Sequence, residues 1–119
     1  MISVSAITVS QLNSYVKVLL ESDDNIRDVF VSGEISNFKN HYASGHLYFS
    51  LKDEKSVVNV VMFSGDARKI KFNLSDGMKV IVRGRVSSYE AAGRYQLYAC
   101  NIFPQGKGEL YAEIGRAHV

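Results

Sequence analysis

The sequence contains one cysteine, one proline and no tryptophan among 119 residues. A single thiol, Cys100, excludes an internal disulfide, and it has no histidine or cysteine at the spacing of a metal site. Apolar runs such as Val57–Phe63 are too short to span a bilayer, and the N-terminus lacks the basic and then apolar order of a signal peptide. We therefore expect a chain with no membrane partner, located in the reducing cytoplasm.

Residues with the spacing of a catalytic site are also lacking. Asp53 and Glu54 are adjacent in an expected hairpin turn, where such residues normally form the turn and face solvent. His41 and His46 flank a polar loop without a third ligand, and His118 lies in the C-terminal tail. The chain is therefore expected to contain no catalytic residue, no metal and no cofactor, although the protein to which it belongs could be an enzyme.

The charges are unevenly distributed along the chain. Residues 1–34 contain two basic and five acidic residues, whereas residues 35–108 contain eleven basic and five acidic residues. A basic, strand-rich segment is what a phosphate-binding surface requires. A solvated surface with an excess of lysine is the alternative interpretation.

An amphipathic helix is predicted near the N-terminus. Thr8 and Gln11 have the spacing of a capping box, and apolar residues follow at helical intervals. The polar run Ser22–Asn25 ends the helix because these side chains compete for backbone hydrogen bonds.

Five strands follow, each recognised by alternation of apolar and polar residues. Val29–Ser36 is the first, and Gly33 would permit a bulge or sharp coil there. A polar loop at Asn37–Gly45 precedes the second strand, His46–Lys52, in which Leu47, Phe49 and Leu51 are expected in the core. The third strand, Val57–Phe63, forms a hairpin with the second, with Val58, Val60 and Met62 facing inward.

A short helix is expected over Gly65–Phe72, followed by a turn at Asp76-Gly77. The fourth strand covers Met78–Val86, and the fifth runs from Tyr95 to Phe103 and is ended by Pro104. Five short strands expose unpaired edges unless they curl into a barrel, and a helix between the third and fourth strands can cover one end of it. We predict an all-β fold with helical additions, a five-stranded OB barrel; a five-stranded open sheet is the alternative.

The corresponding domain boundaries are an N-terminal helical extension at 1–26, the OB barrel at 27–105 and a tail at 106–119. An OB barrel holds single-stranded nucleic acid by stacking bases on aromatic rings while cations follow the phosphates. By the parity of the two central strands, Tyr48 and Asn59 face outward together, Tyr48 to stack on a base and Asn59 to hydrogen-bond a base edge. A tyrosine that merely covers the barrel surface is the alternative.

Other candidates surround these two residues. Lys39 could contact a phosphate from the first loop, where Phe38 could either bind or fold back on the barrel, and the strand arginines could extend the groove, protect sheet edges or pair with Glu90. The full set of predicted nucleic-acid-binding residues is Phe38, Lys39, His46, Tyr48, Lys52, Asn59, Arg83, Arg85, Arg94 and Tyr95.

The segment Asp28–Pro104 resembles the N-terminal OB domain of the exodeoxyribonuclease VII large subunit family. The resemblance extends from about Thr8 to Glu109, and Gly115–Val119 departs from the pattern. It is carried by Gly33-Glu34-Ile35-Ser36-Asn37-Phe38, Ser44-Gly45-His46-Leu47-Tyr48-Phe49-Ser50-Leu51-Lys52-Asp53, Val61-Met62-Phe63 and Val82-Arg83-Gly84-Arg85-Val86.

This resemblance implies a bacterial nuclease, a hydrolase that degrades single-stranded DNA to oligonucleotides. In such a protein this domain would bind the strand, a catalytic domain outside this chain would cut it, and a coiled coil outside this chain would recruit the small subunit. A more distant similarity is to the anticodon-binding barrel of class II aminoacyl-tRNA synthetases. There an aromatic residue matching Tyr48 stacks on a base, a polar residue matches Asn59, and an arginine matches Lys39.

The main hypothesis is a single-stranded DNA-binding module. The alternatives are a protein–protein assembly module of the same nuclease, which an outward apolar patch would indicate, and an RNA- or tRNA-binding OB domain.

Overall fold

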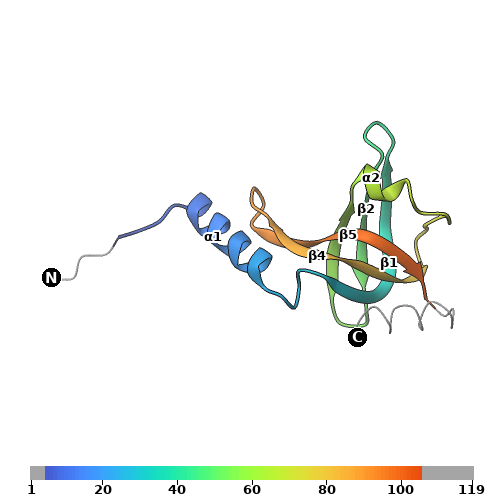
Figure 1. The fold of residues 1–119 in the computed structure, drawn as a ribbon, viewed down its shortest axis with the longest axis horizontal. Helices are drawn as coiled ribbons and strands as arrows, with labels where there is room; N and C mark the ends of the chain where they lie inside the picture. Colours follow the sequence, from blue (N-terminus) through green and yellow to red (C-terminus); the bar gives the residue numbers. More distant parts are fainter. Residues whose placement is uncertain (1–4, 106–119) are drawn as a thin grey trace.

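The computed structural model describes residues 5–105. The elements are α1 (Val9–Ser22), β1 (Val29–His41), β2 (His46–Lys52), β3 (Val57–Met62), α2 (Ser64–Ala67), β4 (Lys79–Tyr89) and β5 (Arg94–Pro104) (Figure 1). The strands close into a barrel in the order β1-β2-β3-β5-β4, with β3 and β5 parallel and the other neighbours antiparallel. The predicted fold and element order are confirmed, and the open-sheet alternative is wrong.

The core lies inside the barrel and is built from alternating residues of all five strands. Its fully buried members include Ile35 of β1, Met62 of β3, Val80 of β4 and Leu97 of β5. The inward sets predicted for the two central strands are confirmed, with Val58 only partly buried. This fixes the register that directs Tyr48 and Asn59 to the outside.

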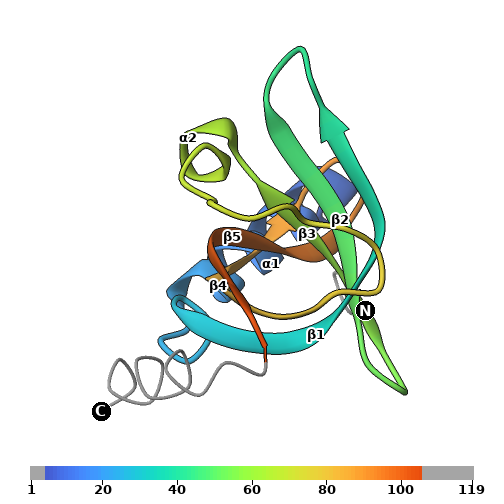
Figure 2. The same cartoon turned by 90° about the vertical axis from the view of Figure 1, so that its right-hand side faces the viewer.

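β1 is longer than predicted. Asn37–His41 belong to the strand, and Lys39, Asn40 and His41 pair with β2, so the predicted loop shrinks to a turn over residues 42–45. A register shift between Ser36 and Lys39 accompanies Asn37 at φ 53°, a left-handed conformation that asparagine tolerates. The result is a β1–β2 hairpin that projects beyond the barrel beside α2 (Figure 2).

The bulge predicted at Gly33 is therefore located farther along the strand. Pairing with β4 is regular through Gly33, and β1 passes there from β4 to β2. A Cβ at this position would lie 2.8 Å from Cγ of Leu51, so the absence of a side chain permits the close approach of β2.

A second irregularity shifts the alternation of β5. Arg83 pairs with Asn101 and Gly84 with Ala99, which leaves Cys100 as the extra residue of a bulge. Beyond it the parity reverses, so that Ile102 is buried and Asn101 is exposed. A Cβ on Gly84 would overlap the carbonyl oxygen of Tyr98, so only glycine fits there.

The two helices differ in how they meet the predictions. α1 begins with the predicted capping box at Thr8 and Gln11. α2 is a single turn, Ser64–Ala67, shorter than the predicted Gly65–Phe72, because Ile70 and Phe72 continue as irregular chain packed against the core. Among the described residues, neither helix is long and apolar enough to cross a membrane.

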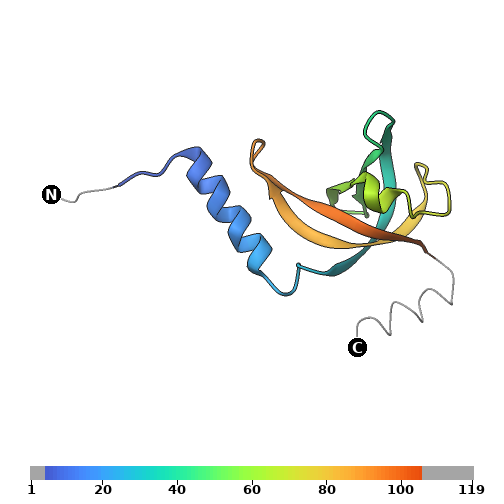
Figure 3. The same cartoon turned by 45° about the horizontal axis from the view of Figure 1, so that its top comes forward.

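α1 stands beside the barrel, near the β4–β5 hairpin (Figure 3). Polar contacts attach it: Asn13 donates to the Glu90 carbonyl, Ser14 donates to the Glu90 carboxylate, and Lys17 lies 3.3 Å from that carboxylate. No residue of α1 is fully buried. The predicted amphipathic helix therefore leaves much of its apolar face in solvent.

Candidate nucleic-acid interface

A row of four paired residues crosses the outer face of the barrel. Tyr48 of β2 pairs with Val61 of β3, Val61 pairs with Tyr98 of β5, and Tyr98 pairs with Arg85 of β4. Directly paired residues project to the same side of a sheet. Tyr48 is 40% exposed, and the guanidinium carbon of Arg85 lies 4.7 Å from the Tyr98 ring centroid. We call these four residues the cross-strand row.

Two further rings extend this row toward the β1–β2 hairpin. The Phe63 ring lies 5.8 Å from that of Tyr98 and 5.2 Å, edge to face, from that of His46. The backbone N–H of Ser64 donates to Nδ1 of His46 at 2.9 Å, which fixes the imidazole orientation. Phe63 is nevertheless 46% exposed, so part of its ring is accessible to a ligand.

Lys39 and Asn59 adjoin Tyr48. Lys39 pairs directly with Tyr48 across the hairpin, and Asn59 pairs with Ser50, two residues along β2. Both side chains are exposed. The predicted outward position of Asn59 on the face that carries Tyr48 is confirmed. An ammonium group, an aromatic ring and a carboxamide therefore lie on one face of three neighbouring strands, with Tyr48 on the central one.

Asn59 also borders a groove between α1 and the barrel. Arg94 and Tyr95 lie on its barrel side, and Leu12 and Val16 of α1 lie on the other. The groove is thus a continuation of the face defined by Tyr48 and Asn59, with an apolar helix as its far wall.

Three of the predicted cations are bound to acids from the first 34 residues. Arg83 forms two hydrogen bonds to Asp28, at 2.8 and 2.7 Å, while Arg85 lies 3.8 Å from Glu21 and Lys52 lies 3.7 Å from Glu34. The hydrogen bond to Asp28 also raises the pKa of Arg83.

These pairs are partly exposed, and such ion pairs contribute little, about 0–1 kcal/mol. A phosphate can therefore compete with the carboxylate for each cation. The acidic N-terminal segment neutralises part of the basic segment that the sequence predicted as a phosphate surface.

Within residues 5–105, the cations without an acidic partner are Lys39, Lys55, Arg68, Lys71, Lys79 and Arg94. Only Lys39 and Arg94 of this group belong to the predicted site. They lie at opposite ends of the outer face, on the β1–β2 hairpin and at the start of β5. The positive charges that a phosphate can reach without displacing an acidic side chain therefore lie at the two ends of that face.

Phe38 folds back on the barrel, which is one of the two orientations predicted for it; the other was toward a ligand. Its ring packs against the barrel core, 6.4 Å from that of Phe49, and its backbone N–H donates to the Asp76 carboxylate. It therefore faces away from Tyr48.

The predicted residues thus fall into separate places. Lys39, His46 and Tyr48 gather with Arg85 on the outer face, and Asn59, Arg94 and Tyr95 border the α1 groove. Lys52 lies at the far end of β2, and Arg83 is bound to Asp28.

Sequence reasoning missed Phe63 and Tyr98. Strand parity already directed Phe63 outward, away from Met62, but only the parallel pairing of β3 with β5 brings Tyr98 beside Val61.

The described residues contain no group of three or more potential metal ligands. Burial raises the pKa of the Cys100 thiol, which makes it a poor nucleophile. Asp53 accepts hydrogen bonds from the backbone N–H groups of Lys55 and Ser56, which lower the pKa of its carboxyl group. The Asp53 carboxylate thus stabilises the turn between β2 and β3, whereas the rings of Tyr48 and Phe63 on the outer face are exposed.

Comparison with known proteins agrees with this geometry. The exodeoxyribonuclease 7 large subunit of Lactobacillus delbrueckii subsp. bulgaricus is 54% identical over 105 residues, covering 88% of this chain and 23% of that protein. That of Clostridium acetobutylicum is 52% identical over 108 residues, covering 91% and 27%. The chain therefore spans about a quarter of the length of these relatives.

Two solved structures share the fold at low sequence identity. A replication protein A heterotrimer bound to single-stranded DNA matches with a TM-score of 0.55 and 16% identity, over 79% of this chain and 73% of that one. The Stn1–Ten1 complex of S. pombe matches with a TM-score of 0.54 and 20% identity, over 77% and 68%. A family model described as an OB-fold nucleic acid binding domain matches residues 7–103. The chain belongs to this family of OB-fold nucleic acid binding domains.

Proposed function

We propose that this chain binds single-stranded DNA as the substrate-binding module of an exodeoxyribonuclease VII large subunit. The observation that carries the proposal is the cross-strand row, which places two rings, Tyr48 and Tyr98, and the Arg85 cation on the outside of the barrel. The similarity of the chain to large subunits of exodeoxyribonuclease 7 supports DNA as the nucleic acid.

Stacking supplies most of the binding free energy in this mechanism. One base stacks on Tyr48 and a second on Phe63, each contributing about 1–3 kcal/mol. Asn59 donates or accepts a hydrogen bond at a base edge, and Lys39 contacts the phosphate between neighbouring bases. Ring faces accept every base, so the binding is tolerant of sequence.

The preference for a single strand has a simple physical origin. In a duplex the base faces are covered by their neighbours, and only an unpaired strand can place them on Tyr48 or Phe63. The cations would attract either form through the phosphates. Discrimination therefore depends on the rings, and affinity at low salt depends on the cations.

Fluorescence anisotropy with labelled single-stranded DNA, duplex DNA and single-stranded RNA, each in a salt series, tests the proposal. We expect single-stranded DNA to bind more tightly than the duplex at every salt concentration, with affinity falling as salt rises. Equal affinity for the duplex would contradict it. Tighter binding of RNA would favour the alternative of an RNA-binding OB domain.

In the full-length protein, the bound strand would be delivered to a catalytic domain outside this chain. The small subunit would join through other regions that are also outside it. Comparing the processing of single-stranded DNA by the full-length complex with and without Tyr48→Ala tests this positioning role. Loss of DNA degradation with the complex still assembled is the expected result.

One observation favours a second candidate function, assembly with another protein surface. Seven of the thirteen large exposed hydrophobic residues among the described residues lie on or just before α1: Ile7, Val9, Leu12, Tyr15, Val16, Val18 and Leu19. Apolar clusters of this kind are typical of interaction sites. The partner in this case is the remaining part of the full-length nuclease.

Substitution on α1 separates the two functions. Tyr15 and Val18 lie on the same side of α1 and form an exposed apolar hollow there. The double substitution Tyr15→Ser and Val18→Ser should leave the DNA affinity of this chain unchanged. In the full-length protein it should weaken the attachment of this domain to the rest of the nuclease, which limited proteolysis would detect as faster cleavage. Unchanged proteolysis would contradict the assembly function.

A further inference from the structure

The β1–β2 hairpin has a second face, opposite to the one that carries Tyr48. Asn40 pairs with Leu47 and projects to the side of Leu47, away from the Lys39–Tyr48 pair. Together with the chain that follows α2, this face encloses a groove of about 540 Å³. Six residues of its two walls matter here: Phe38, Asn40 and Tyr42 from the hairpin, and Arg68, Phe72 and Asn73 from the opposite wall.

The groove combines ring faces with unused polar groups. Tyr42 is 88% exposed and makes no ring contact among the described residues. In that same part of the chain, the amides of Asn40 and Asn73 and the guanidinium of Arg68 make no side-chain hydrogen bond. The volume of the groove lies within the range of about 300–1,000 Å³ that is typical of small-molecule sites, so it has room for a base.

The cations of this wall are held in place by apolar anchors. Ile70, Phe72 and Leu74 are partly buried against the core, and Lys69, Lys71 and Asn73 alternate with them on the solvent side. Lys69 is paired with Asp66 at 3.7 Å, whereas Arg68 and Lys71 are among the cations without an acidic partner. The partly buried residues therefore fix the segment that carries these two positive charges beside the groove. The charges complement a phosphate backbone.

We propose that this groove binds a second stretch of the same single strand, after it passes over the tip of the β1–β2 hairpin. The junction crossed by the strand is short, because Gly45 at the tip lies against Ser64 at the start of α2. Tyr42 stacks on a base, Asn40 and Asn73 contact its edge, and Arg68 and Lys71 contact phosphates. This inference rests on the proposed function, since it extends the path of that strand.

Oligonucleotide length distinguishes the two sites. A strand of about 5 nucleotides fills the outer face alone, whereas one of about 15 reaches both, within the span of about 4–16 nucleotides known for OB folds. Arg68→Ala with Lys71→Ala should weaken binding of the longer strand about tenfold and leave the shorter one unchanged. Because this variant neutralises two fewer phosphates, the slope of log affinity against log salt should decrease by about 1.4 for the longer strand.

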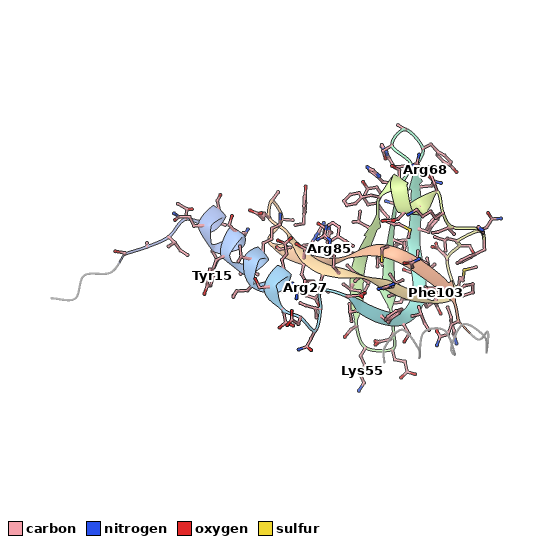
Figure 4. All side chains as sticks on the ribbon, in the orientation of Figure 1. Tyr15, Arg27, Lys55, Arg68, Arg85 and Phe103 are labelled. Carbon is pink, nitrogen blue, oxygen red and sulfur yellow. The ribbon has the colours of Figure 1, made fainter. Side chains whose placement is uncertain are left out.

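A matched control removes the same charge at the other end of the barrel. Lys55 lies in the β2–β3 turn and Lys79 at the start of β4, and Figure 4 shows Lys55 and Arg68 at opposite ends of the barrel. Lys55→Ala with Lys79→Ala should change the two affinities by equal, small factors. Tyr42→Ala, a change at an exposed side chain, should reproduce the length-dependent loss without altering the thermal midpoint.

Two results separate failure of this inference from failure of the proposed function. If Tyr48→Ala weakens both oligonucleotides while the Arg68 and Lys71 variant behaves like the lysine control, the groove is not a binding site and the outer face still is. If the unmodified chain shows no preference for single strands of either length, both proposals are wrong.

Discussion

Arg85 lies between an aromatic ring and an acid, with its guanidinium carbon 4.7 Å from the Tyr98 centroid and Nη1 3.8 Å from a carboxylate oxygen of Glu21. Glu21 belongs to α1, and it also accepts a hydrogen bond from the buried hydroxyl of Ser87 at 2.7 Å. α1 therefore places a negative charge at the end of the cross-strand row, where a phosphate would also have to lie to reach Arg85.

Glu21→Gln should increase the affinity for single-stranded DNA. The amide keeps an oxygen to accept from Ser87 but no longer competes with phosphate for Arg85. An exposed ion pair contributes about 0.2–1 kcal/mol, so the gain is at most about fivefold. Anisotropy at low and high salt measures it, and the gain should shrink as salt screens the charges. Weaker binding at low salt would contradict this role of Glu21.

Tyr48→Ala should reduce the affinity for single-stranded DNA by about 1–3 kcal/mol, through the loss of one stacked base. Its ring is 40% exposed, so the thermal midpoint should change little. Tyr15→Ala on α1 is the matched control, because Tyr15 is an exposed tyrosine far from the row. Equal effects of the two substitutions would argue against stacking on Tyr48.

Gly84→Ala should destabilise the barrel by about 1–3 kcal/mol or more, because the new methyl group overlaps the Tyr98 carbonyl oxygen and β4 and β5 must separate. Urea denaturation gives the change in the free energy of unfolding. Gly65→Ala is the control: nothing lies within 4 Å of its Cβ position in α2, where alanine is the better helix former. A Gly84→Ala variant as stable as that control would contradict the close approach.

Attachment of α1 should depend on pH through Glu90. The hydrogen bond from Ser14, and then that from Lys17, lowers the pKa of the Glu90 carboxyl group below 4.5. A pKa lowered by folding gives stabilisation that is present above 4.5 and is lost as the pH falls through the lowered value. Hydrogen exchange of the α1 amides should show protection decreasing in that acid range.

Glu90→Gln provides the reference for this measurement. It should show the lower protection at all pH values, without the acid transition. A transition of the same size in both proteins would assign it to another group.

Alternation along the chain was sufficient to predict the two central strands and the outward positions of Tyr48 and Asn59. It was not sufficient where the backbone departs from period two. The left-handed conformation of Asn37 lengthens β1, and the extra residue Cys100 reverses the parity of β5. Such bulges depend on pairing with another strand, which no local pattern encodes.

The site was harder to predict because its parts come from distant segments. Tyr98 adjoins Val61 only through the parallel β3–β5 pairing, and the partners of Arg83 and Arg85 precede them by more than fifty residues. Counting charges indicated an acidic N-terminal segment, but it could not show that this segment lies against the basic one.

The seam between β3 and β5 is short, with Val60 opposite Leu97 and Val61 opposite Tyr98. Tyr48 and Tyr98 therefore belong to one surface only while this seam is intact. A ligand that spans both rings binds only the barrel in which β3 and β5 are paired. Its binding free energy therefore adds to the free energy needed to separate these two strands. Occupied molecules should consequently show slower amide exchange at these two strands than free molecules do.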